Sequence, residues 1–199
     1  MPHSTLASSW KWVDVFVFFD TEFSGFTEPS LLSIGLVSES GDESYVELDM
    51  ASDLGRLRHA TANEYVHATV LSQWRHVPDA ACRDDDEIGQ RVGNWLLDLA
   101  RRDGTVELVY DDKIDADLLE TALQKAGMWS ALQHHMQWSI ASYLREQRVV
   151  DDAMAASWAH SLSHDGLERH HALADARALR AGFVAMHGTG APPPRGDSH

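Results

Sequence analysis

The stretch Val15-Phe16-Val17-Phe18-Phe19-Asp20-Thr21-Glu22-Phe23 begins as an apolar run and then turns acidic. An uninterrupted run of valine and phenylalanine is typical of a strand buried on both faces. Because successive side chains of a strand point to opposite faces, Asp20 and Glu22 would project from the same side, about 7 Å apart along the strand. We expect the strand to cover residues 14–19 and the two carboxylates to stand at its end.

An acidic pair in this place permits two interpretations. Charged side chains are seldom brought against a core unless they are paired or bind metal, and Mg²⁺ and Mn²⁺ prefer oxygen ligands. A strand that leaves the core also often meets an acidic residue at its first solvated turn. Taken alone, the pair Asp20 and Glu22 is compatible with a metal site and with a solvated turn.

The chain has 199 residues, of which 44% are apolar, and is long enough for one well-packed domain. We expect a leader over residues 1–12, a single domain over residues 13–187 and a disordered tail rich in glycine and proline over residues 188–199. No stretch approaches the ~20 apolar residues of a membrane span, and residues 1–10 lack the layout of a secretory signal. These features predict a cytoplasmic protein. The single cysteine, Cys82, excludes an intramolecular disulfide and a cysteine-rich zinc site.

The formal net charge at pH 7 is −15, from 31 acidic and 16 basic residues. Binding along a long nucleic-acid duplex draws on many lysines and arginines, so this charge argues against that class of protein. A short or single-stranded partner held at one end fits better. Part of the acidic excess lies in residues 84–87, which we interpret as a solvated loop leading into a helix whose N-terminal dipole favours acid.

The order of predicted elements indicates an α/β fold. Strands are predicted over residues 14–19, 31–37, 44–48, 105–110 and 137–141, the last of which fits a helix nearly as well. Helices are predicted over residues 62–74, 86–102, from the acidic segment after residue 110 to a C-cap at Gly127, and 172–187. Three strands, helices, a strand and then mostly helix predict a mixed sheet of about five strands flanked by helices.

Two further segments place acid beside the expected sheet. The strand ending at Tyr110 runs directly into Asp111, Asp112, Asp115 and Asp117. In open α/β sheets ligands gather beyond strand ends, so the acids after two strands could face one site. The segment 170–175, His-His-Ala-Leu-Ala-Asp, opens the last helix. Its alanines either dock this helix with Asp175 exposed, or let Asp175 approach the sheet closely.

Together these three segments resemble the DEDD superfamily of 3′-to-5′ exonucleases, in the His-containing subclass (DEDDh). The first motif of that family, D-x-E, matches Asp20 and Glu22. The second, an Asp before an apolar pair at a helix start, is best matched by Asp115, and the third, H-x-x-x-x-D, matches His170 and Asp175. The resemblance spans residues 15–183 and implies an RNase H-like fold. It is closest to the small bacterial 3′-to-5′ exoribonuclease-like branch.

The resemblance implies hydrolysis of phosphodiester bonds from the 3′ end of single-stranded RNA or short oligonucleotides. It implies two divalent ions, Mg²⁺ or Mn²⁺, held by Asp20, Glu22, Asp115 and Asp175, with His170 as general base. Many relatives carry Asn shortly before the second-motif Asp, where this chain has Asp111 and Asp112. Asp115 is the first choice of second-motif ligand because its distance to the apolar pair Leu118-Leu119 fits, and Asp111 is the second. Relatives are often homodimers.

Other residues are candidates for substrate contact. Thr21 and Phe23 belong to or follow the first motif, and Phe23 and Phe26 either stack on the terminal base or pack in the core. His171 lies four residues before Asp175, where the Tyr-containing subclass has its tyrosine, so we expect it to touch substrate or solvent beside His170. Bases near the motifs that could hold phosphates are Lys113, Arg169 and Arg177, whereas Asp117 is expected to be solvated.

Two alternatives stay open on the sequence. One is a single-stranded DNA exonuclease, because nothing in the sequence reports on recognition of a 2′-hydroxyl. The other is a non-catalytic RNase H-like module whose acidic surface binds a basic partner.

Overall fold

The computed structural model describes residues 15–141, 144 and 147–188. The leader predicted for residues 1–12 lies outside the described residues, as does the predicted tail apart from Gly188. The elements in chain order are β1 (Val15–Phe23), β2 (Leu31–Ser38), β3 (Glu43–Leu48), α1 (Asp53–Thr61), α2 (Glu64–Thr69), the 3₁₀ helix η1 (Leu71–Gln73), β4 (Ala81–Cys82), α3 (Asp85–Asp103), β5 (Val106–Tyr110), α4 (Lys113–Lys125), α5 (Trp129–Leu132), β6 (Met136–Ile140), α6 (Arg148–Asp165) and α7 (Ala172–His187).

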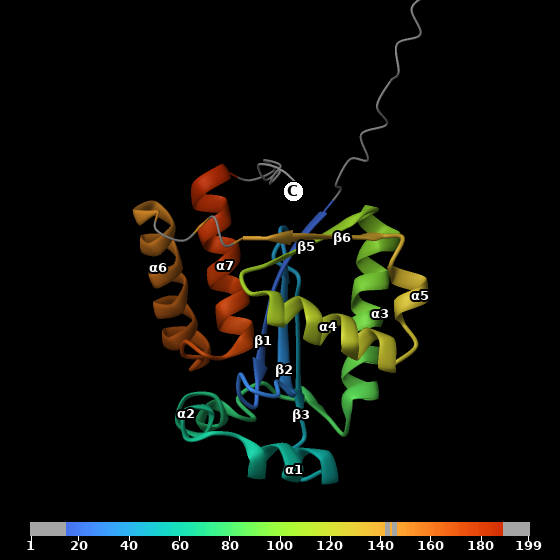
Figure 1. The fold of residues 1–199 in the computed structure, drawn as a ribbon. Coiled ribbons are helices and arrows are strands. Elements are labelled where there is room, and N and C mark those ends of the chain that lie inside the picture. Colours follow the sequence, from blue (N-terminus) through green and yellow to red (C-terminus); the bar gives the residue numbers. More distant parts are fainter. Residues whose placement is uncertain (1–14, 142–143, 145–146, 189–199) are drawn as a thin grey trace, which may run out of the picture.

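The strands form one sheet in the order β4-β3-β2-β1-β5-β6 (Figure 1). β1, β2 and β3 make the antiparallel meander expected from the sequence, and β5 and β6 add parallel to β1. The two-residue strand β4 pairs with β3 and was not predicted. The predicted α/β class, a mixed RNase H-like sheet flanked by helices, is confirmed, and β6 decides the segment 137–141 in favour of a strand.

The alternation of side chains along β1 assigns each face of the sheet to its own helices. Val15, Val17 and Phe19 belong to the core cluster that includes residues of α3 and α4. Phe16 and Phe18 point the other way, and their rings lie 5.4 and 5.0 Å from the ring of Phe183 on α7. In Figure 1, α6 and α7 accordingly lie on one side of the sheet and α3 and α4 on the other.

β1 is longer than predicted. It continues to Phe23 because β2 still pairs with it, with Asp20 opposite Gly35 and Glu22 opposite Ser33. The pairing with β5 ends earlier, at Phe18 and Val109. Beyond that point β1 has a neighbouring strand on one side only. Asp20 and Glu22 therefore lie within a strand, beside the space left where β5 ends.

The helices agree with the sequence where the apolar periodicity is strong. α3 and α7 are confirmed to within one residue at each end. The single helix predicted for residues 62–74 is wrong, because α2 ends at Thr69 and the short η1 follows. α1 was not predicted, since its glycine and scattered polar residues give little helical periodicity.

The acidic segment at the start of α3 is only partly solvated. Asp84 caps the helix by accepting a hydrogen bond from the backbone N–H of Glu87. Asp85, by contrast, is buried and accepts hydrogen bonds from Arg58 at 2.6 and 2.8 Å and from Lys125 at 2.6 Å. The expectation of a wholly solvated run was therefore wrong at Asp85, which ties α1 and α4 to α3.

Candidate metal centre

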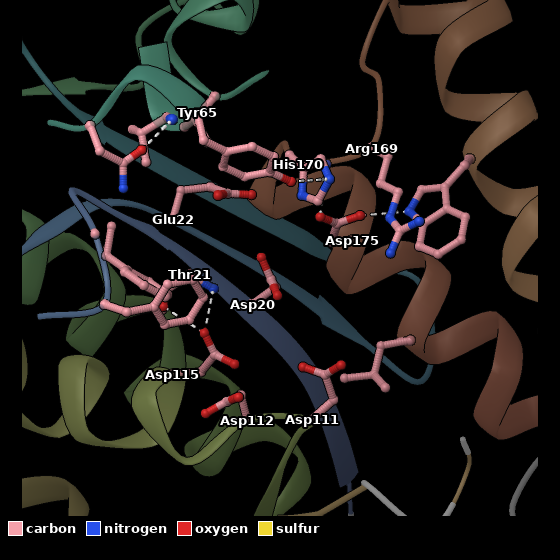
Figure 2. A pocket seen from close by; sticks show the side chains of 18 of the residues that line it. Asp20, Thr21, Glu22, Tyr65, Asp111, Asp112, Asp115, Arg169, His170 and Asp175 are labelled. Carbon is pink, nitrogen blue, oxygen red and sulfur yellow. Dashed lines mark hydrogen bonds between the residues drawn. The ribbon is translucent and has the colours of Figure 1, made fainter. Parts of the chain in front are cut away.

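A cavity of about 470 Å³ opens where β1 continues past the end of β5 (Figure 2). Its walls come from β1, α2, the turn after β5, α6 and the start of α7. Six acidic residues line it: Asp20, Glu22, Asp111, Asp112, Asp115 and Asp175. Three sequence segments that are far apart in the chain thus bring carboxylates to one place, as the sequence predicted for the acids after two strands.

A glycine on β2 sets the position of α7 over the sheet. A Cβ atom at Gly35 would lie 2.4 Å from backbone atoms of Ala172 and Leu173, which is too close for any larger residue without movement of the helix. Gly35 pairs with Asp20. The close approach at this point places Asp175, in the first turn of α7, above the acids of β1.

Both carboxylate oxygens of Asp175 are held by neighbouring groups. The indole N–H of Trp158 on α6 donates to Oδ1 at 2.6 Å, and the backbone N–H of His170 donates to Oδ2 at 2.9 Å. His170 has a φ of 67°, a left-handed conformation that few non-glycine residues adopt. This conformation and the hydrogen bond fix the orientation of Asp175 and of the turn before α7.

Thr21 holds Asp115 on the opposite side of the cavity. Its backbone N–H and its hydroxyl both donate to Oδ1 of Asp115, at 3.2 and 2.6 Å. Thr21 points toward α4 because it alternates with Asp20 and Glu22 along β1. Its side chain is buried and engaged by the carboxylate. Thr21 thus positions Asp115, and because it also lines the cavity its contact with substrate stays a prediction.

The acids after β5 separate into two kinds. Asp112 caps α4 by accepting from the N–H of Ile114, and Asp117 pairs with Lys113 at an exposed site, as expected for a solvated residue. Asp111, Asp112 and Asp115 all line the cavity, but only Asp111 and Asp115 have a carboxylate oxygen within 4.8 Å of one of Asp20 in a group that could hold an ion. Both Asp111 and Asp115 are thus close enough to share an ion with Asp20, so the geometry does not choose between them.

A second group of donor atoms comes from Glu22, His170 and Asp175, again within 4.8 Å of one another. The two acids of the first motif thus belong to different groups, although they share one face of β1. Acidic clusters that could hold metal ions are present, and their oxygen-rich composition suits hard divalent cations.

The electrostatics of the cavity favour protonation of its acids in the absence of cations. Burial, together with the charges of neighbouring carboxylates, raises the pKa of Asp20 and of Glu22 well above their ordinary values. Burial raises the pKa of Asp115 to about 7, against hydrogen bonds from Thr21, and the pKa of Asp175 to about 6. Bound divalent charge would remove this repulsion, so the residues present fit a metal site.

The two adjacent histidines have different surroundings. His170 lines the cavity, and its Nε2 lies 2.8 Å from the hydroxyl oxygen of Tyr65 on α2. Burial and the charge of Arg169 lower the pKa of His170, which favours a neutral ring at pH 7. His171 is buried instead and stacks on Tyr45, with ring centroids 4.5 Å apart. It is not among the residues that line the cavity, so the geometry does not support the predicted contact of His171 with substrate or solvent.

Aromatic side chains form the wall of the cavity next to the first motif. Phe23 and Phe26 line it and meet edge to face, with ring centroids 5.2 Å apart. Phe26 is 74% exposed, which rules out the core packing considered from the sequence. Phe23 is half-buried. Both rings are therefore available to a flat group that enters the cavity.

The three bases that the sequence placed near the motifs are used differently. Lys113 pairs with Asp117, and Arg177 pairs with Glu43 and with Asp165 at 2.6 Å. Among the described residues that line the cavity, Arg169 is the single lysine or arginine.

Sequence reasoning missed Tyr65 and Trp158. Both lie on helices far in sequence from any motif, and each acts through one polar atom that meets a motif residue only in the fold. No sequence signal distinguished Trp158 from an ordinary core tryptophan. No sequence signal distinguished Tyr65 from an ordinary surface tyrosine.

Comparisons with known proteins found no protein-family model and no curated protein that matches this chain. Among the described residues, no helix is both long and apolar enough to cross a membrane.

Proposed function

We propose that this protein is a metal-dependent 3′-to-5′ exonuclease of the DEDD superfamily, His-containing subclass, that acts on single-stranded RNA or short oligonucleotides. The observation that carries the proposal is the convergence of Asp20, Glu22, Asp115, His170 and Asp175 in one cavity. These are the residues whose order and spacing resemble the family motifs. A cytoplasmic location and a homodimer belong to the same proposal.

The carboxylates would hold two divalent cations, Mg²⁺ or Mn²⁺. Asp20, Asp111 and Asp115 would bind one, and Glu22 and Asp175 would bind the other, with Asp20 close enough to both groups to affect each. When bound, such a pair supplies Lewis-acid activation of water and stabilises charge on the scissile phosphate. The hydrogen bonds from Thr21 to Asp115 and from Trp158 to Asp175 would fix the ligands beforehand, which limits the reorganisation needed at binding.

His170 would accept a proton from the attacking water. Its lowered pKa keeps the ring neutral near pH 7, as a general base requires. Tyr65 would hold the ring through Nε2 and so fix its orientation toward the carboxylates. The rings of Phe23 and Phe26 would stack on the terminal base. Such stacking tolerates any base, because every base has a flat face.

The test is incubation of the purified protein with 5′-labelled single-stranded RNA and Mn²⁺. We expect a ladder of products shortened stepwise from the 3′ end, and no products in EDTA. His170→Ala should lower kcat by roughly 10²–10⁴-fold, the usual contribution of a general base, with a smaller effect on binding. His134→Ala is the matched control, because His134 is exposed on the surface.

The alternatives are separated in the same experiment. Faster shortening of a DNA strand of identical sequence would assign a DNA exonuclease. An internal cut, or no cut of either strand, would contradict the proposal, and absence of divalent-ion binding as well would favour the non-catalytic module. A larger loss of kcat in His171→Ala than in His170→Ala would overturn the assignment of the base.

A further inference from the structure

Arg169 lines the cavity and holds none of the metal ligands by a hydrogen bond from its side chain, although its charge lowers the pKa of His170. Six acids line the cavity and would repel a polyanion, yet one guanidinium stands among them. Figure 2 shows it beside Asp175, on the far side of the carboxylates from Thr21 and Asp115. Among the described residues Arg169 takes part in no ion pair, in contrast to Lys113 and Arg177.

The position of Arg169 is built by its neighbours. Its guanidinium carbon lies 4.8 Å from the centre of the Trp158 ring, within the range of a cation–π contact. Trp158 is itself fixed by its hydrogen bond to Asp175. The indole ring thus limits the positions of the guanidinium, whose planar fork suits two parallel hydrogen bonds to a phosphate.

The backbone of Arg169 is fixed from the other side by a buried glutamine. The side-chain amide of Gln73 donates to the carbonyl of Arg169 at 3.0 Å and accepts from the N–H of Glu168 at 2.7 Å. Gln73 is 5% exposed and comes from η1, distant in sequence. Separate elements therefore fix the main chain and contact the side chain of Arg169, which limits the positions that its guanidinium can take.

We propose that Arg169, seated on Trp158, binds the strand phosphate that lies immediately 5′ of the scissile phosphate. This inference rests on the proposed function. The nucleotide released from a 3′-hydroxyl end carries no phosphate on its 3′ side, so the next phosphate of the strand lies 5′ of the one that is cleaved. The cations held by the carboxylates meet the charge of the scissile phosphate, and Arg169 meets the next charge at the exposed edge of the cavity.

The experiment measures binding rather than turnover. The probes are two five-nucleotide single strands labelled at the 5′ end: one with all phosphates, and one with a neutral methylphosphonate in place of the phosphate next to the scissile one. Anisotropy is measured in Ca²⁺, and the length of the probe is checked after each titration. The proteins are wild type, Arg169→Ala and, as a control for lost charge near the cavity, Lys113→Ala.

We expect Arg169→Ala to bind the all-phosphate strand about tenfold more weakly, the usual loss for a charge-assisted hydrogen bond. The slope of log affinity against log salt should fall by about 0.7, as expected for one phosphate contact on a single strand. Wild type and Arg169→Ala should bind the methylphosphonate strand equally. Lys113→Ala should change neither strand by more than about twofold, because its charge is already paired with Asp117 at an exposed site.

Equal binding of the all-phosphate strand by wild type and Arg169→Ala would overturn the inference, as would an equal loss on both strands. Failure of the wild type to bind either strand would overturn it together with the proposed function. The methylphosphonate could weaken binding by the wild type but not by Arg169→Ala, while RNA is not shortened in Mn²⁺. That result would uphold the phosphate site and reject the exonuclease.

Discussion

Two groups of buried carboxylates in this protein are treated in opposite ways. Asp85 is surrounded by cations of the chain, and despite burial the hydrogen bonds from Arg58 and Lys125 lower its pKa. Asp20 lies among other carboxylates, and burial and their charges raise its pKa well above the ordinary value. The first arrangement is complete within the chain. The second is unfavourable unless cations come from solution, which is the signature expected of a metal site.

The largest effect should come from Asp20→Asn. Removing this carboxylate removes a ligand near both donor groups, and we expect activity to fall by about 10⁴-fold, since bound metal supplies several kcal/mol of transition-state stabilisation. The metal-free protein should become more stable, because a repelled buried charge is lost. Single-turnover assays and denaturant unfolding in EDTA measure the two effects. Asp117→Asn is the matched control. Full activity of Asp20→Asn would contradict the role of Asp20 as a metal ligand.

Asp85→Asn should show the opposite pattern. It leaves the guanidinium of Arg58 buried without its charged partner, so we expect a loss of about 3 kcal/mol in the free energy of unfolding. The kcat of the folded fraction should stay within about twofold of wild type, because Asp85 does not line the cavity. The control variant is Asp86→Asn at the neighbouring exposed residue, which should change neither the free energy of unfolding nor kcat. A stable but inactive Asp85→Asn protein would contradict the distinction between a structural carboxylate at Asp85 and metal-binding carboxylates around Asp20.

The pH dependence of metal stabilisation sharpens the same comparison. Folding raises the pKa of Asp115 from 3.8 to about 7 and that of Asp175 to about 6, so the folded protein binds more protons than the unfolded chain in this range. These acids therefore lower the stability of the metal-free protein as pH rises from about 4 to about 7.

Mn²⁺ competes with those protons, so the difference in unfolding free energy with and without Mn²⁺ should grow over the same range. Burial lowers the pKa of His171 to about 4, so this residue makes the unfolding free energy rise with pH. Its contribution is the same with Mn²⁺ and with EDTA and therefore cancels in the difference. Unfolding curves at pH 5, 6, 7 and 8 with Mn²⁺ or EDTA measure the difference. A difference that does not change with pH would argue against carboxylate ligands of raised pKa.

The smallest effect should come from Tyr65→Phe, which removes one hydroxyl and keeps the ring beside His170. We expect kcat to fall about fivefold with KM unchanged, because one hydrogen bond of ~1 kcal/mol that orients the base is lost. In a double-mutant cycle, the substitution should have no further effect when His170 is already alanine. An equal loss in that background would place Tyr65 on a different part of the reaction.

The parts of the fold that the sequence predicted correctly are those with a local pattern. Three local patterns each predict their own element: the apolar run of β1, the apolar face of α3 and the alanine-rich start of α7. The continuation of β1 to Phe23 was missed because it depends on pairing with β2, and the break in the helix predicted for residues 62–74 has no glycine or proline to mark it.

The candidate site could be predicted as a set of motifs but not as a geometry. Spacing alone left His170 and His171 nearly equivalent, and their separation depends on the left-handed backbone at His170 and on the ring of Tyr45. The approach of both Asp111 and Asp115 to Asp20 depends on where β5 ends relative to β1. Tyr65, Trp158 and Gln73 act through tertiary contacts that leave no trace in local sequence.

The central claim is that the carboxylates around Asp20 form a site for divalent cations, and calorimetric titration of the purified protein with Mn²⁺ tests it most directly. We predict saturable binding of two ions per chain in the wild type and in Asp86→Asn, with loss of at least one ion in Asp20→Asn. Absence of saturable binding by the wild type, or an unchanged titration of Asp20→Asn, would contradict the claim.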